Sequence, residues 1–586
     1  MSFAIFEKYF NSDAIKLAYY RVQCWTDKTV KDQVGLKAFG SNIELNAQNL
    51  SERILAGHYT PQRGFKFYMP KPSKTLRTKT MLKLEDAIVY QAIVNRIAEF
   101  NQPKLAELED FVFGSVLSPD VLKGTAILKE KEPNYFFYKY WKGLFFKFKL
   151  SVLQSIEEDK VKYKFETDIT GFFDCIPHYN LLSILSSQFG VEDEILDLLA
   201  DCFNIWSGTK ESMTPGVGIP QGTGPSFFFA NLILHQLDDN IIGAGYKYYR
   251  YMDDIHIYGY SEAELIDALL IIDKYAKGNG LSINSKKTSI QKIEKDLEKE
   301  TVVQAIKNLG TVSLISESID NDFFSLLISG ESEKTPESEI ELFEIDSVKL
   351  SDQDQDLSSF VLGHNISTLT NDDEIKAFWH EKFKEVETLL PNLFDNPQEL
   401  LTSLKLNESA DDIDFIRLGA QYTASYRALK ECNEQVQLNV DLVKYWLYAY
   451  KTFFWRANNI GITLSEYNNN QEIKKVLIQL YSKDLKPYEW VKYFILITLS
   501  YSQTFTDQEL RQLFFKWLKE EDSTLVKISL YRLLFKHSKS KQFDSSLKKE
   551  LQKESALELK LLITDFNRSL HKKDIDMIEF INSIGL

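Results

Sequence analysis

Three aspartates at the ends of two strand-like segments are the residues best suited to do chemistry. VKYKFETD (161–168) alternates apolar and polar residues, which predicts a half-buried strand that carries Asp168 at its end. Later in the chain, KYYRYMDDIHIYGY predicts a hairpin with Asp253 and Asp254 at its turn. An Asp-Asp turn alone also has a local explanation, because aspartates cap their own backbone. A carboxylate at each of two strand ends favours a functional site.

Asp168, Asp253 and Asp254 supply the hard oxygen ligands that two magnesium ions need, with manganese as a substitute. Magnesium keeps several waters and is bound by a few carboxylates together with substrate phosphates. Two such ions, about 3.5 to 4 Å apart, can activate an attacking hydroxyl and stabilise the leaving oxygen of an in-line displacement. The three carboxylates therefore predict a site for nucleotidyl transfer.

A glycine-rich segment, GVGIPQGTGPSFFFANLILHQLDD, lies between these acids. It predicts a turn followed by a helix from about Ser226. Its glycines let the backbone approach a flat ligand closely. Gln221 is the side chain of this turn with both donor and acceptor capacity. The segment predicts a surface for a nucleotide, and a plain loop before a buried helix is the alternative.

The composition sets the class of protein in which such a site would work. The chain has 586 residues, 44% of them hydrophobic, and a net charge of −15, so disorder throughout is excluded. Four cysteines without CxxC spacing exclude a zinc ribbon and a disulfide scaffold. The apolar runs are shorter than the roughly 20 residues that span a bilayer. The start of the chain lacks a signal-peptide pattern. We expect a cytoplasmic protein with no membrane partner.

The charge is unevenly distributed along the chain. Residues 51–150 carry 17 basic and 10 acidic side chains, whereas residues 301–360 carry 3 basic and 13 acidic ones. Gly330, Pro336 and many serines interrupt the acidic stretch, which favours a linker or surface insertion over a solvated helical face.

Beyond about residue 370, amphipathic segments of 12 to 20 residues without strand-like alternation predict an all-helical region. DSTLVKISLYRLLFKHSKS resembles the second helix of a HEAT-type repeat, with an irregular helical bundle as the alternative.

NYFFYKYWKGLFFKFKL interleaves aromatic residues with lysines and could stack bases and bind phosphates. Within it, FKFKL (146–150) alternates, which favours an ordinary amphipathic strand over nucleic-acid contact.

The ordered set of motifs resembles the reverse transcriptases. FETDITGFFD is similar to their motif A, GIPQGTGPSFFFAN to motif B, YMDD to motif C and GLSINSKKT to motif D. Upstream, YTPQRGFKFYMPKPSKTLRTKTMLKLEDAIVYQAIVNRI resembles the fingers blocks of group II intron and retron-like enzymes, and FVFGSVL their following block. The resemblance covers roughly residues 50–300. It implies an α+β fold with a right-hand polymerase core of fingers and palm. The helical pattern beyond residue 370 predicts that an all-helical C-terminal domain, HEAT-repeat-like or an irregular bundle, follows this core.

The resemblance and the charge pattern divide the chain into four parts. An N-terminal extension and fingers span residues 1–160, and a palm with motifs A to D spans 161–300. A thumb-like or acidic linker region spans 301–370, and the helical C-terminal domain spans 371–586.

The resemblance also implies roles for single residues. Asp168 and Asp253 would be the principal metal ligands, Asp254 the third catalytic acid, and the carbonyl oxygen of Ile169 would complete a metal shell. Other residues would bind the incoming nucleotide: Phe173 as the aromatic gate against a ribose 2′-hydroxyl, Gln221 as its support, Lys71, Lys74 and Arg77 at its triphosphate, and Lys287 near the departing pyrophosphate.

An RNA-directed DNA polymerase core with a long helical tail resembles the abortive-infection and defence-associated enzymes of bacteria. The retron hallmarks NAxxH and VTG are absent from the sequence. This resemblance implies dNTPs and DNA or RNA as partners, a homo-oligomer, and synthesis that starts from a protein hydroxyl or without a template. A non-coding RNA partner is left open. The alternatives are a retron or group II-type enzyme and a catalytically silent scaffold that binds nucleic acid.

Overall fold

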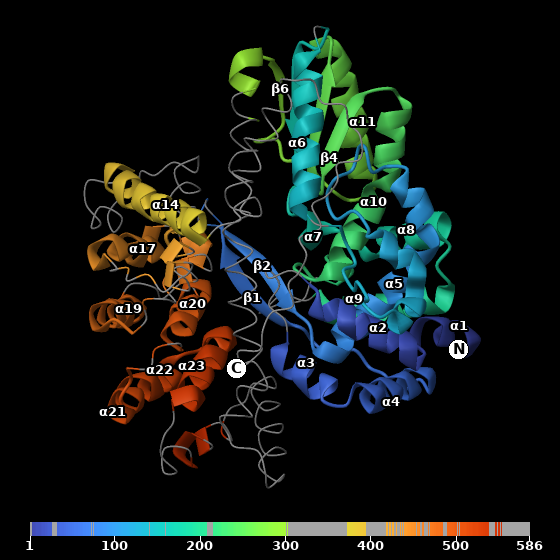
Figure 1. The fold of residues 1–586 in the computed structure, drawn as a ribbon. Coiled ribbons are helices and arrows are strands. Elements are labelled where there is room, and N and C mark those ends of the chain that lie inside the picture. Colours follow the sequence, from blue (N-terminus) through green and yellow to red (C-terminus); the bar gives the residue numbers. More distant parts are fainter. Residues whose placement is uncertain are drawn as a thin grey trace. The chain divides into compact units, whose positions relative to one another are not determined.

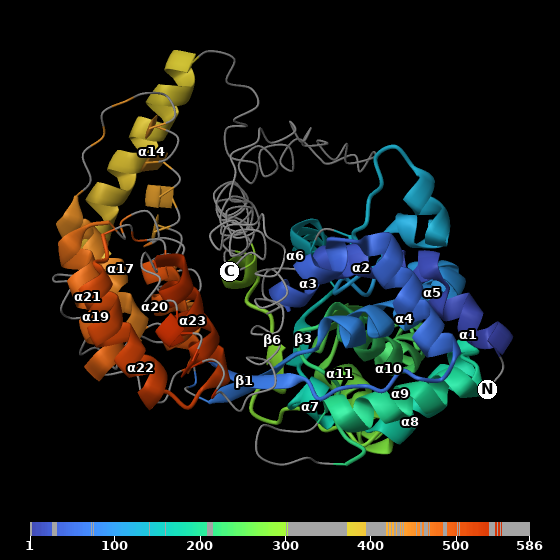
Figure 2. The ribbon, with the colours of Figure 1, turned by 90° about the horizontal axis from the view of Figure 1, so that it is seen from below.

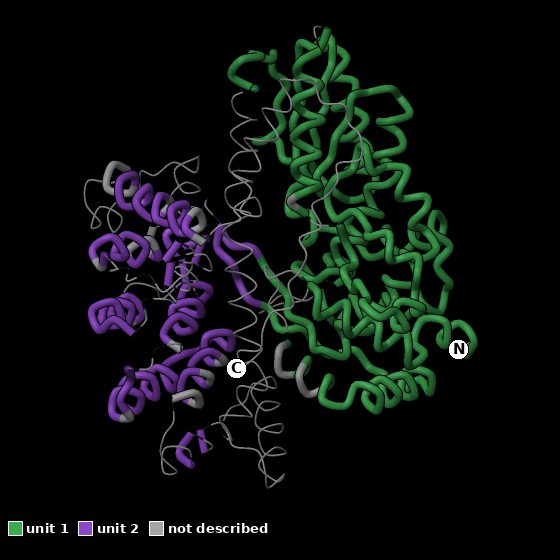
Figure 3. The backbone as a smooth tube through the Cα atoms, viewed as in Figure 1, with its two compact units in different colours: residues 1–66, 78–306 green, residues 67–77, 307–586 purple. Residues whose placement is uncertain are grey.

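The computed structural model describes residues 3–25, 32–302 and 372–393, together with interrupted stretches of 418–553. Within 32–302, residues 72, 74, 140, 159, 208–214, 300 and 301 are not described. Two compact units emerge, residues 1–66 with 78–306 and residues 67–77 with 307–586 (Figure 3). Lys74 and nearly all of the expected linker at 301–370 lie outside the described residues.

A four-stranded antiparallel sheet organises the first unit. Its order is β4-β5-β3-β6, with bounds β3 Tyr163–Thr167, β4 Lys247–Tyr251, β5 Asp254–Gly259 and β6 Ser289–Lys292 (Figure 1). The strand predicted before Asp168 is confirmed, and so is the hairpin predicted around Asp253 and Asp254.

Helices cover both faces of this sheet, as the alternation of side chains along β4 shows. Tyr248 bonds to Asp238 of α10 (Gly224–Gly243), whereas its neighbour Tyr249 bonds to Ser155 of α6 (Trp141–Glu157). Successive side chains of a strand point to opposite faces, so α10 and α6 lie on opposite sides. The helix predicted from about Ser226 is therefore present and begins at residue 224.

The strand expected at FKFKL is wrong, because residues 146–150 lie inside the α-helix α6. Leu144, Phe148, Val152 and Ile156 are all buried, at a spacing of four residues. This spacing lines one face of a helix. The short alternation of FKFKL is part of that longer helical pattern, which outweighs it.

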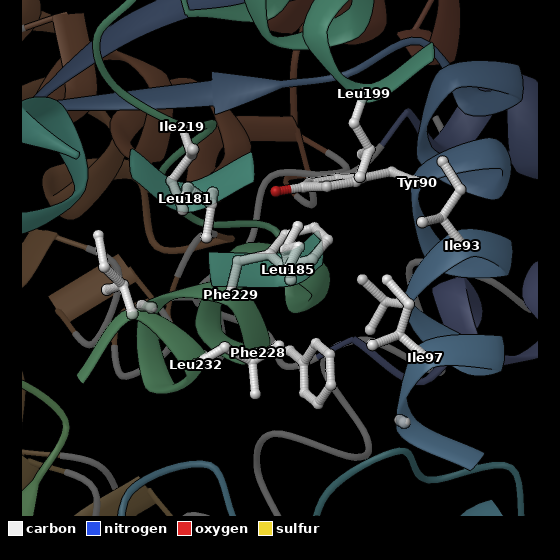
Figure 4. Packing of buried hydrophobic residues seen from close by; sticks show 14 of the residues in the cluster. Tyr90, Ile93, Ile97, Leu181, Leu185, Leu199, Ile219, Phe228, Phe229 and Leu232 are labelled. Carbon is white, nitrogen blue, oxygen red and sulfur yellow. The ribbon is translucent and has the colours of Figure 1, made fainter. Parts of the chain in front are cut away.

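The core of the first unit lies between α10 and helices α5 (Leu84–Ala106), α8 (His178–Phe189) and α9 (Asp193–Trp206). Helices α8 and α9 run side by side in two perpendicular views (Figures 1 and 2). In Figure 4 the side chains of α5 face those of the other three helices, among them Tyr90, Ile93, Ile97, Leu181, Leu185, Leu199, Phe228, Phe229 and Leu232.

The remaining helices of the first unit frame this core. They are α1 Phe3–Phe10, α2 Ser12–Gln23, α3 Gln33–Gly40, α4 Ile43–Leu55, the 3-10 segment η1 Pro119–Lys129, α7 Phe172–Cys175 and α11 Glu262–Gly278. Ser261 caps the start of α11: its side chain accepts from the Glu264 amide, and the Glu264 side chain accepts from the Tyr260 amide.

The second unit contains the outer part of a hairpin, β1 (Phe65–Pro70) and β2 (Leu76–Met81), and its other described elements are helical. Its described elements are α14 Asp372–Leu393, α17 Val440–Thr452, η3 Phe454–Arg456, α19 Gln471–Lys483, α20 Glu489–Ser500, α21 Asp507–Glu509, a π-helical turn η4 Leu510–Phe514, α22 Phe515–Glu520 and α23 Thr524–His537. The predicted helical character is confirmed for these residues, and the HEAT-type repeat stays a prediction. Among the described helices, none is long and apolar enough to cross a membrane.

Candidate active site

The register of β3 against β5 brings the carboxylates of motifs A and C to one end of the sheet. Thr167 pairs with Ile255, so Asp168 and Asp254, the next residues along each antiparallel strand, lie opposite each other. Asp253 lies in the two-residue turn between β4 and β5. The three acids predicted from the sequence are therefore close neighbours.

Lys287 joins this group from the segment before β6. Its Nζ lies 2.6 Å from Oδ2 of Asp168. The pKa of Lys287 is raised, chiefly by this hydrogen bond and further by the charges of Asp168, Asp254 and Asp253. The Lys287 ammonium thus interacts electrostatically with all three carboxylates, so the predicted Lys287 lies at the same site.

The donor set around Asp168 fits a metal ion. Oδ1 of Asp168 is buried and has no hydrogen-bond partner among the described residues, as expected of an acceptor that is completed by a cation. The carbonyl of Asp168 accepts from the Asn284 amide at 2.8 Å. Successive carbonyls of an extended chain point to opposite edges. The Ile169 carbonyl therefore points away from Asn284, towards the side on which β5 pairs.

A buried ion pair fixes the turn that carries Asp253. Met252 adopts a positive φ of 58°, a strained conformation for a residue other than glycine. Its carbonyl accepts from Nη1 of Arg250 at 2.7 Å. Arg250 also donates to both carboxylate oxygens of Asp238 on α10, at 2.8 and 2.6 Å, and both side chains are 1% exposed. The turn is thereby tied to the helix of motif B.

Residues 111–114 support the same turn from another side. The Phe113 amide donates to the Arg250 carbonyl, and the Arg250 amide donates to the Phe111 carbonyl, both at 2.8 Å. A Cβ on Gly114 would lie 2.4 Å from the Met252 amide nitrogen, so the contact requires glycine. Asn231 of α10 binds the Gly114 carbonyl at 2.8 Å.

These positioning residues were not predicted from the sequence. The available signal was Arg250 itself, which shares the face of its strand with the apolar ring of Tyr248. A charged residue on a buried face requires a partner of opposite charge.

The glycine-rich loop of motif B is held against the helix after motif A. The Ile219 amide donates to the Phe173 carbonyl at 2.9 Å, and the His178 ring lies 2.6 Å from the Gly218 carbonyl. Gly218 has a φ of 88°, and a Cβ there would meet the Asp174 carbonyl at 3.1 Å. The predicted gate residue Phe173 lies in this junction, 7% exposed, with its ring edge-on to Phe227.

Gln221 lies at the tip of that loop. Its side-chain Oε1 is buried without a hydrogen-bond partner among the described residues. Its backbone carbonyl accepts from the Thr80 amide of β2 at 3.0 Å. The loop is thus fixed by its backbone, while the side chain keeps an unused acceptor.

Two lysines that we did not predict lie close to the segments of motifs A and B. The Lys79 side chain packs against Gly222, where an added Cβ would lie 3.6 Å from its Nζ. Lys66 on β1 is 9% exposed, and burial lowers its pKa to about 8 against the opposing influence of Asp174. Both lie in the basic stretch of residues 51–150 that the sequence showed.

The predicted triphosphate ligands Lys71 and Arg77 lie in the outer hairpin, which belongs to the second unit. The Lys71 amide donates to the Thr75 carbonyl at 2.8 Å, and Arg77 is a half-buried residue of β2.

On the face of the sheet covered by α6, His256 lies between two carboxylates. Its Nδ1 is 3.3 Å from Glu166 and its Nε2 is 3.7 Å from Asp254. Contact with His256 holds the pKa of Glu166 at about 2. Burial would lower the pKa of His256, but Asp254 and Glu166 outweigh it and raise the pKa. The ring also packs edge-on against Phe148, as expected for a packed strand residue.

Comparison with known proteins agrees with this geometry. Residues 69–312, less than half of the chain, match the family model described as reverse transcriptase (RNA-dependent DNA polymerase). The chain therefore carries a reverse transcriptase domain over these residues. No curated protein matches the chain.

Among solved structures, one match is the telomerase from Candida albicans in complex with a TWJ fragment of telomeric RNA. The two chains are 13% identical, with a TM-score of 0.29, over 76% of this chain. The match spans 65% of the telomerase chain, less than two thirds of its length.

Proposed function

We propose that this protein is a DNA polymerase of reverse transcriptase type that uses dNTPs and two divalent metal ions. The observation that carries the proposal is the meeting of Asp168, Asp253, Asp254 and Lys287 at one end of the sheet. Structural packing alone gives no reason to gather three carboxylates at one edge, because like charges repel one another.

The carboxylates would act as the metal ligands. Asp168 and Asp253 would each bind metal, with Asp254 as the third acid and the Ile169 carbonyl completing one shell. Bound magnesium supplies Lewis acidity for the attacking and leaving oxygens. Lys287 is charged at neutral pH, because its raised pKa keeps the proton on Nζ. It can therefore neutralise the departing pyrophosphate or give it a proton.

The loop of motif B and the helix after motif A would hold the nucleotide. The unused Oε1 of Gln221 can accept a hydrogen bond from it. Phe173, packed against Phe227 and the backbone of residue 219, has little freedom to move. A fixed ring at that position would exclude a ribose 2′-hydroxyl sterically, so we expect deoxynucleotides as substrates.

The cations of the hairpin would bind the triphosphate. We propose Lys71, Lys74 and Arg77 for this role. We add Lys79, which lies beside Gly222 of the motif B loop, and Lys66, which interacts electrostatically with Asp174. Lysine and arginine bind phosphate oxygens through charge-assisted hydrogen bonds. A buried lysine such as Lys66 gains most from such a partner, because burial otherwise disfavours its charge.

The test is incorporation of labelled dNTPs by the purified full chain. The assay needs an RNA template–primer, a DNA template–primer and no nucleic acid as separate reactions, each with magnesium, manganese or EDTA. We expect metal-dependent incorporation in at least one reaction. Absence of incorporation in every reaction with metal would contradict the proposal.

We further propose a role in bacterial antiphage defence, with the enzyme in the cytoplasm. We also propose that the chain comprises fingers (1–160), a palm (161–300) and a helical region that begins at residue 371. Support for this part of the proposal is the long helical tail and the resemblance of the motifs to abortive-infection enzymes. Phage should form fewer plaques on cells that express the wild-type chain than on cells without it. Cells that express Asp253→Asn should show no such reduction. Equal plaque counts would contradict the defence role.

Protein priming can be tested in the reaction without nucleic acid. A phenol, with a pKa near 10, is a better candidate nucleophile than an alkyl alcohol. Label that stays with the polypeptide on a denaturing gel and is released by nuclease would support priming by the protein itself. Label that never migrates with the polypeptide would contradict it.

A further inference from the structure

The outer part of the β1–β2 hairpin packs on helix α20 of the second unit. The ring of Phe67 stacks on Trp490, with centroids 5.8 Å apart and planes 7° from parallel. Both side chains are buried, at 2% and 5% exposure. The neighbouring Tyr68 amide donates to Oε1 of Glu489 at 2.8 Å. A side-chain stack and a bond to the main chain together fix the strand on the helix.

Glu489 connects this contact to α23, a helix that packs on α20 within the second unit. Its Oε2 accepts from the Ser523 hydroxyl at 2.5 Å. Ser523 in turn precedes α23, whose Lys527 amide donates to the Ser523 carbonyl at 2.9 Å. Close by, Lys492 of α20 pairs with Glu521 at 2.8 Å. Helices α20 and α23 therefore form one framework, and the Tyr68 amide is bonded to it.

The hairpin needs such support because it has only two strands. An isolated two-stranded hairpin is marginally stable in water, and one of its edges leaves backbone groups unpaired. At its base, the Thr80 amide bonds to the Gln221 carbonyl of the motif B loop. In the outer part of the hairpin, Phe67 and Tyr68 contact α20, and this contact supports the strand among the described residues.

The residues that touch α20 are chain neighbours of the proposed triphosphate ligands. Lys66 directly precedes Phe67, and Lys71 follows Tyr68 by three residues. A strand is stiff over so short a distance, so the position of these ammonium groups depends on where Phe67 is held. If the binding site is correctly arranged in only a fraction of the molecules, the apparent dissociation constant equals the intrinsic one divided by that fraction.

We propose that α20, through Trp490 and Glu489, anchors the hairpin and thereby sets the affinity of the enzyme for nucleoside triphosphate. The proposal rests on the proposed function of the hairpin lysines. It assigns the helical region a positioning role that needs none of its residues to touch substrate.

The test compares four forms of the full chain: wild type, Trp490→Ala, Trp490→Phe and Trp517→Ala. Trp517 is the matched control, because it is a buried tryptophan of the same unit that packs on Tyr481 and Phe514. Two quantities are measured for each, the hydrogen exchange of the peptide that contains Tyr68 and the KM and kcat for dNTP incorporation.

We expect Trp490→Ala to speed exchange at Tyr68 and to raise the KM for dNTP by about two- to tenfold, the range expected for loss of one aromatic pair, with kcat little changed. Trp490→Phe should restore both values, since phenylalanine can still stack. Glu489→Ala should raise exchange and KM in the same direction, whereas Glu489→Gln, which keeps an acceptor oxygen, should not.

Equal effects of Trp490→Ala and Trp517→Ala on KM, or unchanged exchange at Tyr68 in Trp490→Ala, would overturn the proposal. A wild-type chain that incorporates no dNTP would contradict the proposed function alone. In that case the exchange measurements still decide whether α20 anchors the hairpin.

Discussion

Asp168 and Asp254 differ in solvent exposure and in their charged neighbours, although both lie at one end of the sheet. The Asp168 side chain is 14% exposed and pairs with Lys287, whereas the Asp254 side chain is 60% exposed and lies near His256. The Asp168 carboxylate is therefore the more enclosed of the two, and its buried Oδ1 has no hydrogen-bond partner among the described residues. These differences follow from position alone, since the residue type is the same.

Phe173 is the residue whose replacement should change substrate choice. Truncation to alanine removes the ring that packs on Phe227 and opens space for a 2′-hydroxyl. We expect the ratio of rNTP to dNTP incorporation to rise by roughly an order of magnitude in Phe173→Ala. Phe172→Ala, which removes a buried ring of the same short helix, is the control and should leave the ratio as it is. A ratio that stays at the wild-type value in Phe173→Ala would place the gate elsewhere.

Strand β3 could be predicted from the sequence because its apolar and polar residues alternate, and β4 and β5 because two short strand-like segments flank the polar Asp253–Asp254 turn. Helix α6 could not, because FKFKL satisfies a period of two over five residues, whereas the helical spacing of the buried residues becomes clear only over the thirteen residues from Leu144 to Ile156. Arg250 and Asp238 were missed for another reason. They lie on different elements, twelve residues apart, and only the packing of β4 on α10 joins them.

The contact between Tyr68 and Glu489 was the hardest to predict from the sequence, because 421 residues separate the two partners. The roles of Lys71, Lys74 and Arg77 depend on family resemblance and stay predictions.

The pair of Arg250 and Asp238 should be important for the stability of the sheet. Removing one partner leaves the other charged and buried, which typically costs about 3–5 kcal/mol. We expect Arg250→Met to lower the free energy of unfolding in urea by about that amount, and Arg250→Met with Asp238→Leu to recover part of it. Lys277→Met, which breaks an exposed pair with Asp273, should cost less than about 1 kcal/mol. Similar losses for Arg250→Met and Lys277→Met would show that the buried pair is dispensable.

Asp86 at the start of α5 should make the stability of the first unit depend on pH. Burial raises its pKa from 3.8 to about 6, although it accepts from the Tyr59 hydroxyl and the Gln62 amide. A group whose pKa is higher in the folded state stabilises the fold at pH values below its unfolded-state pKa. This stabilisation is lost as the pH rises through the folded-state pKa.

Relative to Asp86→Asn, the wild type should therefore lose stability between pH 4 and pH 7, by roughly 3 kcal/mol for a shift of this size. Urea unfolding of both forms at several pH values measures this difference. A difference that does not vary with pH would contradict the raised pKa.

For the whole protein, the helical region beyond the polymerase domain suggests assembly. Many amphipathic helices outside a complete catalytic core need a surface on which to bury their apolar faces, and a second copy of the chain is one such surface. We expect light scattering at micromolar concentration to give a mass that is a multiple of 67.9 kDa. A lone monomer across that concentration range would count against oligomerisation.

The proposed function requires that the three carboxylates at the sheet end support metal-dependent nucleotidyl transfer. This is tested most directly by the rate of dNTP incorporation in Asp168→Asn and Asp253→Asn, with Asp267→Asn on the exposed face of α11 as control. Asparagine keeps the shape of the side chain and relieves repulsion in the cluster, so both variants should fold.

We predict that Asp168→Asn and Asp253→Asn lose at least about a thousandfold in rate while their unfolding midpoints and that of the control stay near the wild-type value. Incorporation by Asp168→Asn and Asp253→Asn at the wild-type rate would contradict a catalytic role for the three carboxylates.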